Sequence, residues 1–119
     1  MKLSLEARRL GDVIIIHCEG RIVYRDEAAA LSRVVGEALQ HTREVVLDLE
    51  DVHGMDSAGL GELVLLHMSA EGQGKSVRIA AATSQVQKLL ELTNLVSVFD
   101  LHDTLEGAIA VDDAVAENA

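Results

Sequence analysis

The chain has 119 residues, of which 49% are hydrophobic and 25% are charged, and these are the proportions of one globular domain rather than of a disordered segment. Its net charge of −10 and its 2% aromatic content argue against nucleic acid and anionic membranes as partners, because both are negatively charged and single-strand binding relies on aromatic stacking. One cysteine excludes an internal disulfide, and no apolar run approaches the about 20 residues that cross a membrane, so we expect a cytoplasmic protein.

Two strands and a tight turn are expected at the N-terminal end. Residues 3–9 alternate apolar and polar side chains, which predicts a half-buried edge strand. Gly11 and Asp12 are typical of a tight turn into residues 13–18, whose apolar side chains occupy both alternating sets of positions. This second run predicts a strand covered on both faces and ended by Gly20. Together the two strands predict an initial β-hairpin.

A helix and a second buried strand are expected next. Residues 26–41 carry apolar side chains at the spacing of a helix with one buried face, and Asp26 is expected as its N-cap or as a first-turn acid. Residues 45–49 are a further apolar run, which predicts a strand buried on both faces. The polar residues 50–56 are expected to form a loop.

Helices and strands alternate through the rest of the chain. The remaining expected elements are a helix that Gly72 or Gly74 ends, a strand over residues 76–81, a helix capped by Ser84, a strand over residues 96–101, and a last helix around residues 105–109. This order predicts an α/β fold with a mixed, mostly parallel sheet of about five strands and with four helices. We expect a single domain over residues 1–119, with its core over about 3–110 and a frayed acidic tail over 111–119.

The patterns of common enzyme and metal sites are incomplete in this chain. Gly74-Lys75-Ser76 is similar to the end of a P-loop, but the motif needs Gly at position 69, where the residue is Ser, and the tripeptide leads from a helix into a strand. The five histidines have no metal-ligand spacing, and one cysteine cannot complete a metal quartet. Ser57 lacks the G-x-S-x-G elbow of hydrolases. We therefore expect no catalytic residue, no cofactor and no metal site.

Ser57 lies where the expected loop meets the next helix, as its N-cap or, if Asp56 is the cap, as a first-turn residue. A helix N-terminus favours a phosphate and nearby acids repel it, so phosphate on Ser57 would be tolerated by the fold but would change what the surface binds. Between Arg43 and Lys75 there is no base and there are seven acids: Glu44, Asp48, Glu50, Asp51, Asp56, Glu62 and Glu71. We expect this face to bind a basic surface, and phosphate to change that binding by local repulsion.

Residues 45–61 read VVLDLEDVHGMDSAGLG. This segment resembles the signature of the STAS domain, and more narrowly the V-L-D-L-x-x-V-x-x-M-D-S-[ST]-G-L-G pattern of bacterial anti-sigma factor antagonists. The resemblance continues through Gly74-Lys75, through the helix that contains residues 88–92 and through the run at residues 95–99. It covers residues 3 to about 110, which is nearly the whole chain.

The resemblance implies a binding module controlled by phosphorylation. In that family the unphosphorylated antagonist binds an anti-sigma factor of the serine-kinase type and frees the sigma factor. The kinase then phosphorylates the Ser after the motif's Asp, the complex dissociates, and a serine phosphatase resets it. That Ser is Ser57 here, so the chain is a substrate and not an enzyme. The residues implied in partner binding are Arg21, Val23, Asp56, Ser57, Ala58, Gly59 and Leu60, with Gly59 expected to allow close approach of the partner.

Two departures from the family pattern concern this surface. Gly20-Arg21-Ile22-Val23 stands where family members often have Gly-Glu-Leu-Asp, so Arg21 and Val23 replace two acids. Ala58 replaces the usual Ser or Thr, which removes an alternative phosphate acceptor.

Three alternatives stay open beside the antagonist. The chain could be a STAS subunit of a lipid ABC transporter, or of a larger signalling assembly, without a switch at Ser57. It could also be a nucleotide-binding STAS sensor, or a small enzyme that uses Ser57. Retention of Asp56 and Ser57 favours the antagonist, and the missing base and metal ligands argue against the enzyme.

Overall fold

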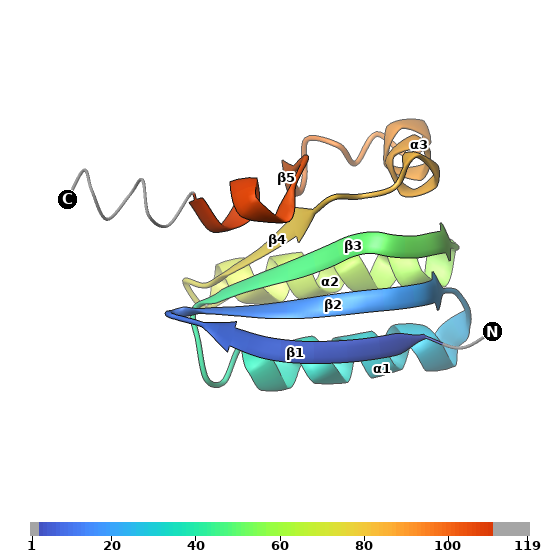
Figure 1. Ribbon diagram of the computed structural model, residues 1–119. Helices are drawn as coiled ribbons and strands as arrows, with labels where there is room; N and C mark the ends of the chain where they lie inside the picture. The colour runs from blue at the N-terminus through green and yellow to red at the C-terminus, as the bar shows by residue number, and fades with distance from the viewer. Residues whose placement is uncertain (1–2, 111–119) are drawn as a thin grey trace.

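A five-stranded sheet forms the centre of the computed structural model, which describes residues 3–110 (Figure 1). Its strands are β1 (Ser4–Leu10), β2 (Val13–Ile22), β3 (Glu44–Met55), β4 (Ser76–Ala80) and β5 (Asp100–His102), and they lie side by side in chain order. β1 runs antiparallel to β2, and every later pair is parallel. The predicted mixed, mostly parallel sheet with an initial hairpin is confirmed. The tail predicted over residues 111–119 lies outside the described residues.

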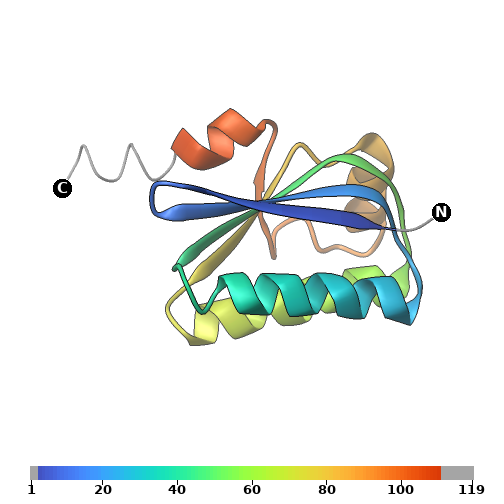
Figure 2. The same ribbon diagram turned by 60° about the horizontal axis from the view of Figure 1, so that its bottom comes forward.

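Helices cover both faces of this sheet (Figure 2). α1 (Tyr24–Ala38) and α2 (Ser57–Gly72) pack side by side on one face, as expected when right-handed crossovers join neighbouring parallel strands. α3 (Ser84–Leu92) joins β4 to β5, and its buried residues Val86 and Leu90 pack into the same core as α1 and α2. A fourth helical segment over residues 105–110 covers part of the opposite face.

Two apolar cores explain why the central strands are apolar on both faces. The larger core lies under α1 and α2 and contains the β2 residues Ile14, Ile16 and Cys18. The smaller core lies under the last helical segment and consists of Val13, Ile15, Val46, Ala80 and Ala108. Alternate residues of β2 therefore enter different cores, and the predicted burial of β2 and β3 on both faces is confirmed.

The second and third strands are longer than the sequence pattern predicts. Gly20 was expected to end β2, but it takes a positive φ of 118° at a register irregularity, and the strand continues to Ile22. The expected polar loop over residues 50–56 is mostly strand, because β3 runs to Met55 in register with the end of β2. The polar side chains of this stretch did not prevent pairing, since Glu50 and His53 are exposed while Val52 is buried in the core.

Two further boundaries differ from expectation in the C-terminal half. Thr83, not Ser84, is the N-cap of α3: its hydroxyl accepts a hydrogen bond from the Val86 N–H at 3.5 Å and donates one to the Val52 carbonyl. The strand expected over residues 96–101 is the short β5, because the chain is still in turns after Asn94, which has a φ of +58°.

In the N-terminal half, Asp26 lies in the first turn of α1, and Val23 holds the N-cap position.

Arg78 links the sheet to the last helical segment. Its side chain is 8% exposed, and its Nη2 lies 2.9 Å from Glu44 Oε2 while its Nε lies 3.4 Å from Asp100 Oδ2. Its Nη1 donates to the Ala108 carbonyl at 3.3 Å, and the Ser76 hydroxyl donates to the same Glu44 oxygen. This buried group therefore links β3, β4 and β5 to the segment over residues 105–110.

Candidate phosphorylation and partner-binding site

Ser57 is the first residue of α2, and its side chain is exposed. It lies just beyond the carboxyl end of β3, beside the carboxyl end of β2, where Ile22 pairs with Met55. The carboxyl edge of a parallel sheet is where α/β proteins commonly place their binding sites. The fold therefore presents the Ser57 hydroxyl at the edge where a ligand or partner is most readily met.

Asp56 is the N-cap of α2, so the second of the two interpretations of Ser57 holds. Its Oδ1 accepts a hydrogen bond from the Gly59 N–H at 3.1 Å, and its Oδ2 accepts one from the Tyr24 N–H at 2.9 Å. The Tyr24 donor, and after it the Gly59 donor, lower the pKa of Asp56 below its ordinary value. Tyr24 has a φ of +63°, a costly conformation for a bulky residue, and the bond to Asp56 helps to hold it.

We expect Asp56→Asn to lower the free energy of unfolding near neutral pH by about 1 kcal/mol, because the amide can still cap α2 but lacks the charge that both donors favour. Since the pKa of Asp56 is lowered in the folded state, its contribution is present above its unfolded pKa and is lost as the pH falls through the folded value. Urea unfolding at a series of pH values should therefore show that the stability difference between the wild type and Asp56→Asn shrinks as the pH falls from neutral to below about 4. A constant difference over that range would contradict the assigned role of the carboxylate.

Gly59 and Leu60 are buried within the chain itself. A Cβ at Gly59 would lie 2.2 Å from the Ile22 carbonyl oxygen and 2.8 Å from Ile22 Cγ2, so only glycine fits there. Leu60 is 7% exposed and belongs to the larger core. The close approach that Gly59 permits is therefore between α2 and the end of β2, and both residues act on the surface by holding Ser57 in place.

The other predicted partner-binding residues lie at or near the surface. Asp56 and Ala58 are half-buried, and Ser57 is exposed. Arg21 is exposed at the end of β2, and its side chain runs along Gly54 of β3, where an added Cβ would lie 3.4 Å from its Nε. Val23 is half-buried between β2 and α1. The end of β2 and the start of α2 thus form one surface, which we call the Ser57 surface.

A groove between α1 and α2 opens beside Ser57. Its volume is about 550 Å³. It is lined by Arg25, Ala28, Ala29, Ser57, Ala58, Gly61, Glu62, Val64 and Leu65. The α1 side of this groove was not among the predicted site residues. The signal in the sequence for this side is the run of three alanines at residues 28–30, which leaves room between two packed helices.

The acids that flank Ser57 in the sequence are dispersed in space. Four of the seven pair with bases: Glu44 with Arg78, Asp48 and Asp51 with His17, and Glu71 with His67. Asp56 stays beside Ser57 as the cap of α2, and Glu62 lines the same groove as Ser57. Arg25 lines the same groove as Ser57, and Arg21 lies at the neighbouring strand end. The acids between Arg43 and Lys75 are therefore not all gathered at Ser57, because β2 and β4 bring bases to acids that are distant in sequence. That this face binds a basic surface stays a prediction.

His17 lies between two of these carboxylates. Its Nδ1 lies 2.9 Å from Asp48 Oδ2 and its Nε2 lies 3.0 Å from Asp51 Oδ2, so each ring nitrogen faces a carboxylate. The hydrogen bond to Asp48 is the main cause that raises the pKa of His17 above its ordinary value. Within residues 3–110 no group of three or more His, Cys, Asp or Glu side chains is arranged to hold a metal ion.

Residues 4–108 match the family model of the STAS domain, and the chain belongs to this family. A STAS-domain-containing protein of Pseudomonas aeruginosa is 29% identical over 94 residues, which are 76% of this chain and 89% of that protein. A protein of Thermotoga maritima named as a putative anti-sigma factor antagonist is 30% identical over 66 residues, which are 56% of this chain and 58% of that protein.

Solved structures have the same fold. An anti-sigma factor antagonist from Mycobacterium paratuberculosis superposes with a TM-score of 0.82 at 22% identity, over 92% of this chain and 93% of that one. A sulfate transporter family protein from Wolinella succinogenes superposes with a TM-score of 0.78 at 17% identity, over 91% and 90% of the two chains. Between residues 3 and 110, no helix combines the length and apolar character needed to cross a bilayer.

Proposed function

We propose that this chain is an anti-sigma factor antagonist. Unphosphorylated, it binds an anti-sigma factor of the serine-kinase type through the Ser57 surface, and phosphorylation of Ser57 releases it. The names of the similar proteins support the antagonist role. The observation that carries the switch is the exposed Ser57 hydroxyl at the first residue of α2, at the mouth of the groove between α1 and α2.

The phosphoryl transfer needs only an accessible hydroxyl from this chain. The Ser57 Oγ forms a bond to the γ-phosphorus of ATP, its proton passes to a base of the kinase, and ADP leaves. The kinase holds the ATP and its metal ion, so this chain acts as substrate. The N-terminal end of α2 and the nearby Arg25 favour the negative charge that Ser57 acquires.

Release follows from the chemistry of the groove. Apart from Arg25, Glu62 and Ser57, its lining residues are Ala28, Ala29, Ala58, Gly61, Val64 and Leu65. A partner that covers these small apolar groups removes water from the groove mouth, and a phosphate there carries about −1.5 to −2 charges that must lose hydration. The unphosphorylated surface therefore binds, and the phosphorylated one does not. A serine phosphatase restores the first state.

A serine-kinase anti-sigma factor from the same cell, supplied with Mg-ATP, is expected to add one phosphoryl group at Ser57. Mass spectrometry should find it on the wild-type chain and on Ser69→Ala, an exposed serine of the same helix, but not on Ser57→Ala. In a pull-down with the same partner, Ser57→Ala should bind as the unmodified protein does. Ser57→Asp should lose at least about tenfold in affinity, since one buried unpaired charge costs 1.4 kcal/mol or more.

The proposal fails if no phosphate is found and both Ser57 variants bind every tested anti-sigma factor like the wild type. That result would instead favour a STAS subunit of a transporter or of a larger assembly, in which Ser57 has no switch role. The observation behind this second candidate is the structural likeness to a sulfate transporter family protein.

A further inference from the structure

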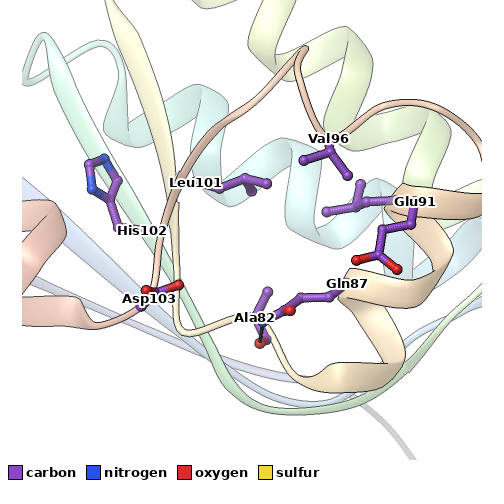
Figure 3. A pocket seen from close by; sticks show the side chains of 8 residues that line it. Ala82, Gln87, Glu91, Val96, Leu101, His102 and Asp103 are labelled. Atoms are coloured by element: carbon purple, nitrogen blue, oxygen red, sulfur yellow. Dashed lines mark hydrogen bonds between the residues drawn. The ribbon is translucent and has the colours of Figure 1, made fainter.

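A second concave surface lies at the same carboxyl edge of the sheet, between α3 and β5 (Figure 3). We call it the α3 pocket. Its volume is about 120 Å³. It is lined by Ala82, Gln87, Leu90, Glu91, Val96, Leu101, His102 and Asp103. None of these residues belongs to the Ser57 surface or to the groove between α1 and α2.

The α3 pocket has an apolar interior and an acidic rim. Leu90 is fully buried, and Figure 3 shows Leu101 and Val96 pointing into the space from β5 and from the loop after α3. The carboxylates of Glu91 and Asp103 stand on two sides of the opening, and Gln87 is held by a hydrogen bond from its Nε2 to the Ala82 carbonyl.

Both rim carboxylates are exposed, and within residues 3–110 neither makes a side-chain hydrogen bond or an ion pair. Glu91 lies near the C-terminal end of α3, where the helix dipole already favours a cation, and the last turn of α3 contains no base. Lys88 is on the same helix but is not within ion-pairing distance of Glu91. A positive charge at this opening would therefore be stabilised by two carboxylates and by the end of α3.

The size of the α3 pocket fits one long side chain. An apolar cavity of about 150 Å³ takes a molecule of the size of benzene, so 120 Å³ accommodates an aliphatic stem with its polar end at the rim. Lysine and arginine have such a stem below a cationic group.

The surroundings of the pocket favour a protein segment over a free amine. Leu92 is 73% exposed, Val96 44% and Val98 38%, and all three belong to the segment that borders the opening. A small amine would leave these side chains in water, whereas a peptide that inserts one basic side chain can cover them with its neighbouring residues.

We propose that the α3 pocket is a docking site for a segment of a partner protein. One basic side chain of the segment enters between Glu91 and Asp103, and its apolar neighbours cover Val96 and Val98. The contact needs neither the Ser57 hydroxyl nor its phosphorylation. This proposal can therefore be tested independently of the proposed switch at Ser57.

The test is a titration of the ¹⁵N-labelled chain, followed by NMR, with the peptide acetyl-Leu-Lys-Val-amide. We expect its addition to shift the amide signals of Ala82, Gln87 and residues 101–103. The peptide with norleucine in place of lysine keeps the stem and lacks the ammonium, and it should bind about fivefold more weakly, as should the lysine peptide to the double variant Glu91→Gln/Asp103→Asn. The double variant Glu50→Gln/Glu106→Gln removes two other exposed acids and should bind like the wild type.

Three results would overturn the proposal. The norleucine peptide could bind as tightly as the lysine peptide, which would show that the carboxylates of Glu91 and Asp103 do not contribute to binding. The shifts could lie elsewhere on the chain or fail to appear, which would remove the pocket. Finally, n-pentylamine could bind as tightly as the peptide, which would make the site one for a small cation and not for a protein segment.

Discussion

Replacing Gly59 by alanine is expected to lower the free energy of unfolding by about 3 kcal/mol or more, because the added methyl group overlaps with backbone that cannot move aside. The new Cβ would lie 2.2 Å from the Ile22 carbonyl oxygen, 2.8 Å from Ile22 Cγ2 and 3.1 Å from Met55 Cγ. Relief requires the first turn of α2 to move away from the end of β2. That movement strains the hydrogen bonds that Asp56 accepts from Gly59 and Tyr24.

Gly61→Ala is the matched control, two residues further along the same helix. Nothing lies within 4 Å of a Cβ at Gly61, so alanine there should raise the stability by about 0.5–1 kcal/mol through its helix propensity. Urea unfolding of the two variants and of the wild type measures both effects. Equal midpoints for Gly59→Ala and the wild type would contradict the close packing of α2 against β2.

Replacing Arg78 by methionine is expected to lower the free energy of unfolding by about 2–4 kcal/mol. The substitution leaves Glu44 without its cation, and it removes the donor to the Ala108 carbonyl. This loss of stability is at or below the loss that is usual when one partner of a buried ion pair is removed. The reason is that the side chains of Glu44 and Asp100 are 28% and 49% exposed and regain some hydration. The segment over residues 105–110 should also lose protection against amide hydrogen exchange.

A double-mutant cycle isolates this ion pair from the packing of the arginine stem. Arg78→Met/Glu44→Met should be less destabilising than the sum of the two single variants, since removing both partners leaves neither member of this pair without the other. Arg8→Met, an exposed arginine on β1, should change the stability by no more than about 0.5 kcal/mol. Additive single effects would show that the pair with Glu44 adds nothing to the stability beyond the other contacts of Arg78.

Local patterns in the sequence were enough to predict the elements and the central part of the site. The apolar runs on both alternating sets of positions predicted the buried strands, and the small two-residue turn at Gly11 predicted the hairpin. Asp56 and Ser57 were placed correctly at the start of α2, because capping depends on residues three apart in the chain.

Other parts of the site were not predictable from local pattern. The polar stretch that was expected to be a loop continues β3, because pairing with the end of β2 supplies its backbone partners. Arg25 reaches the site from α1, which precedes Ser57 by a whole strand. The space at Gly59 is taken by Ile22 of the same chain and not kept for a partner, which only the packing of α2 on β2 reveals.

The distribution of charge shows most clearly which properties of this protein follow from its sequence and which depend on its folded structure. The total of −10, the alternation of strands and helices, and the position of Ser57 at a helix start can be read from the sequence, because they depend on composition and on neighbours within a few residues. The partners of the acids follow from the folded arrangement of the strands, since His17 and Arg78 reach Asp48 and Glu44 from other strands. Coulomb energy depends on distance in space, and folding sets that distance independently of separation along the chain.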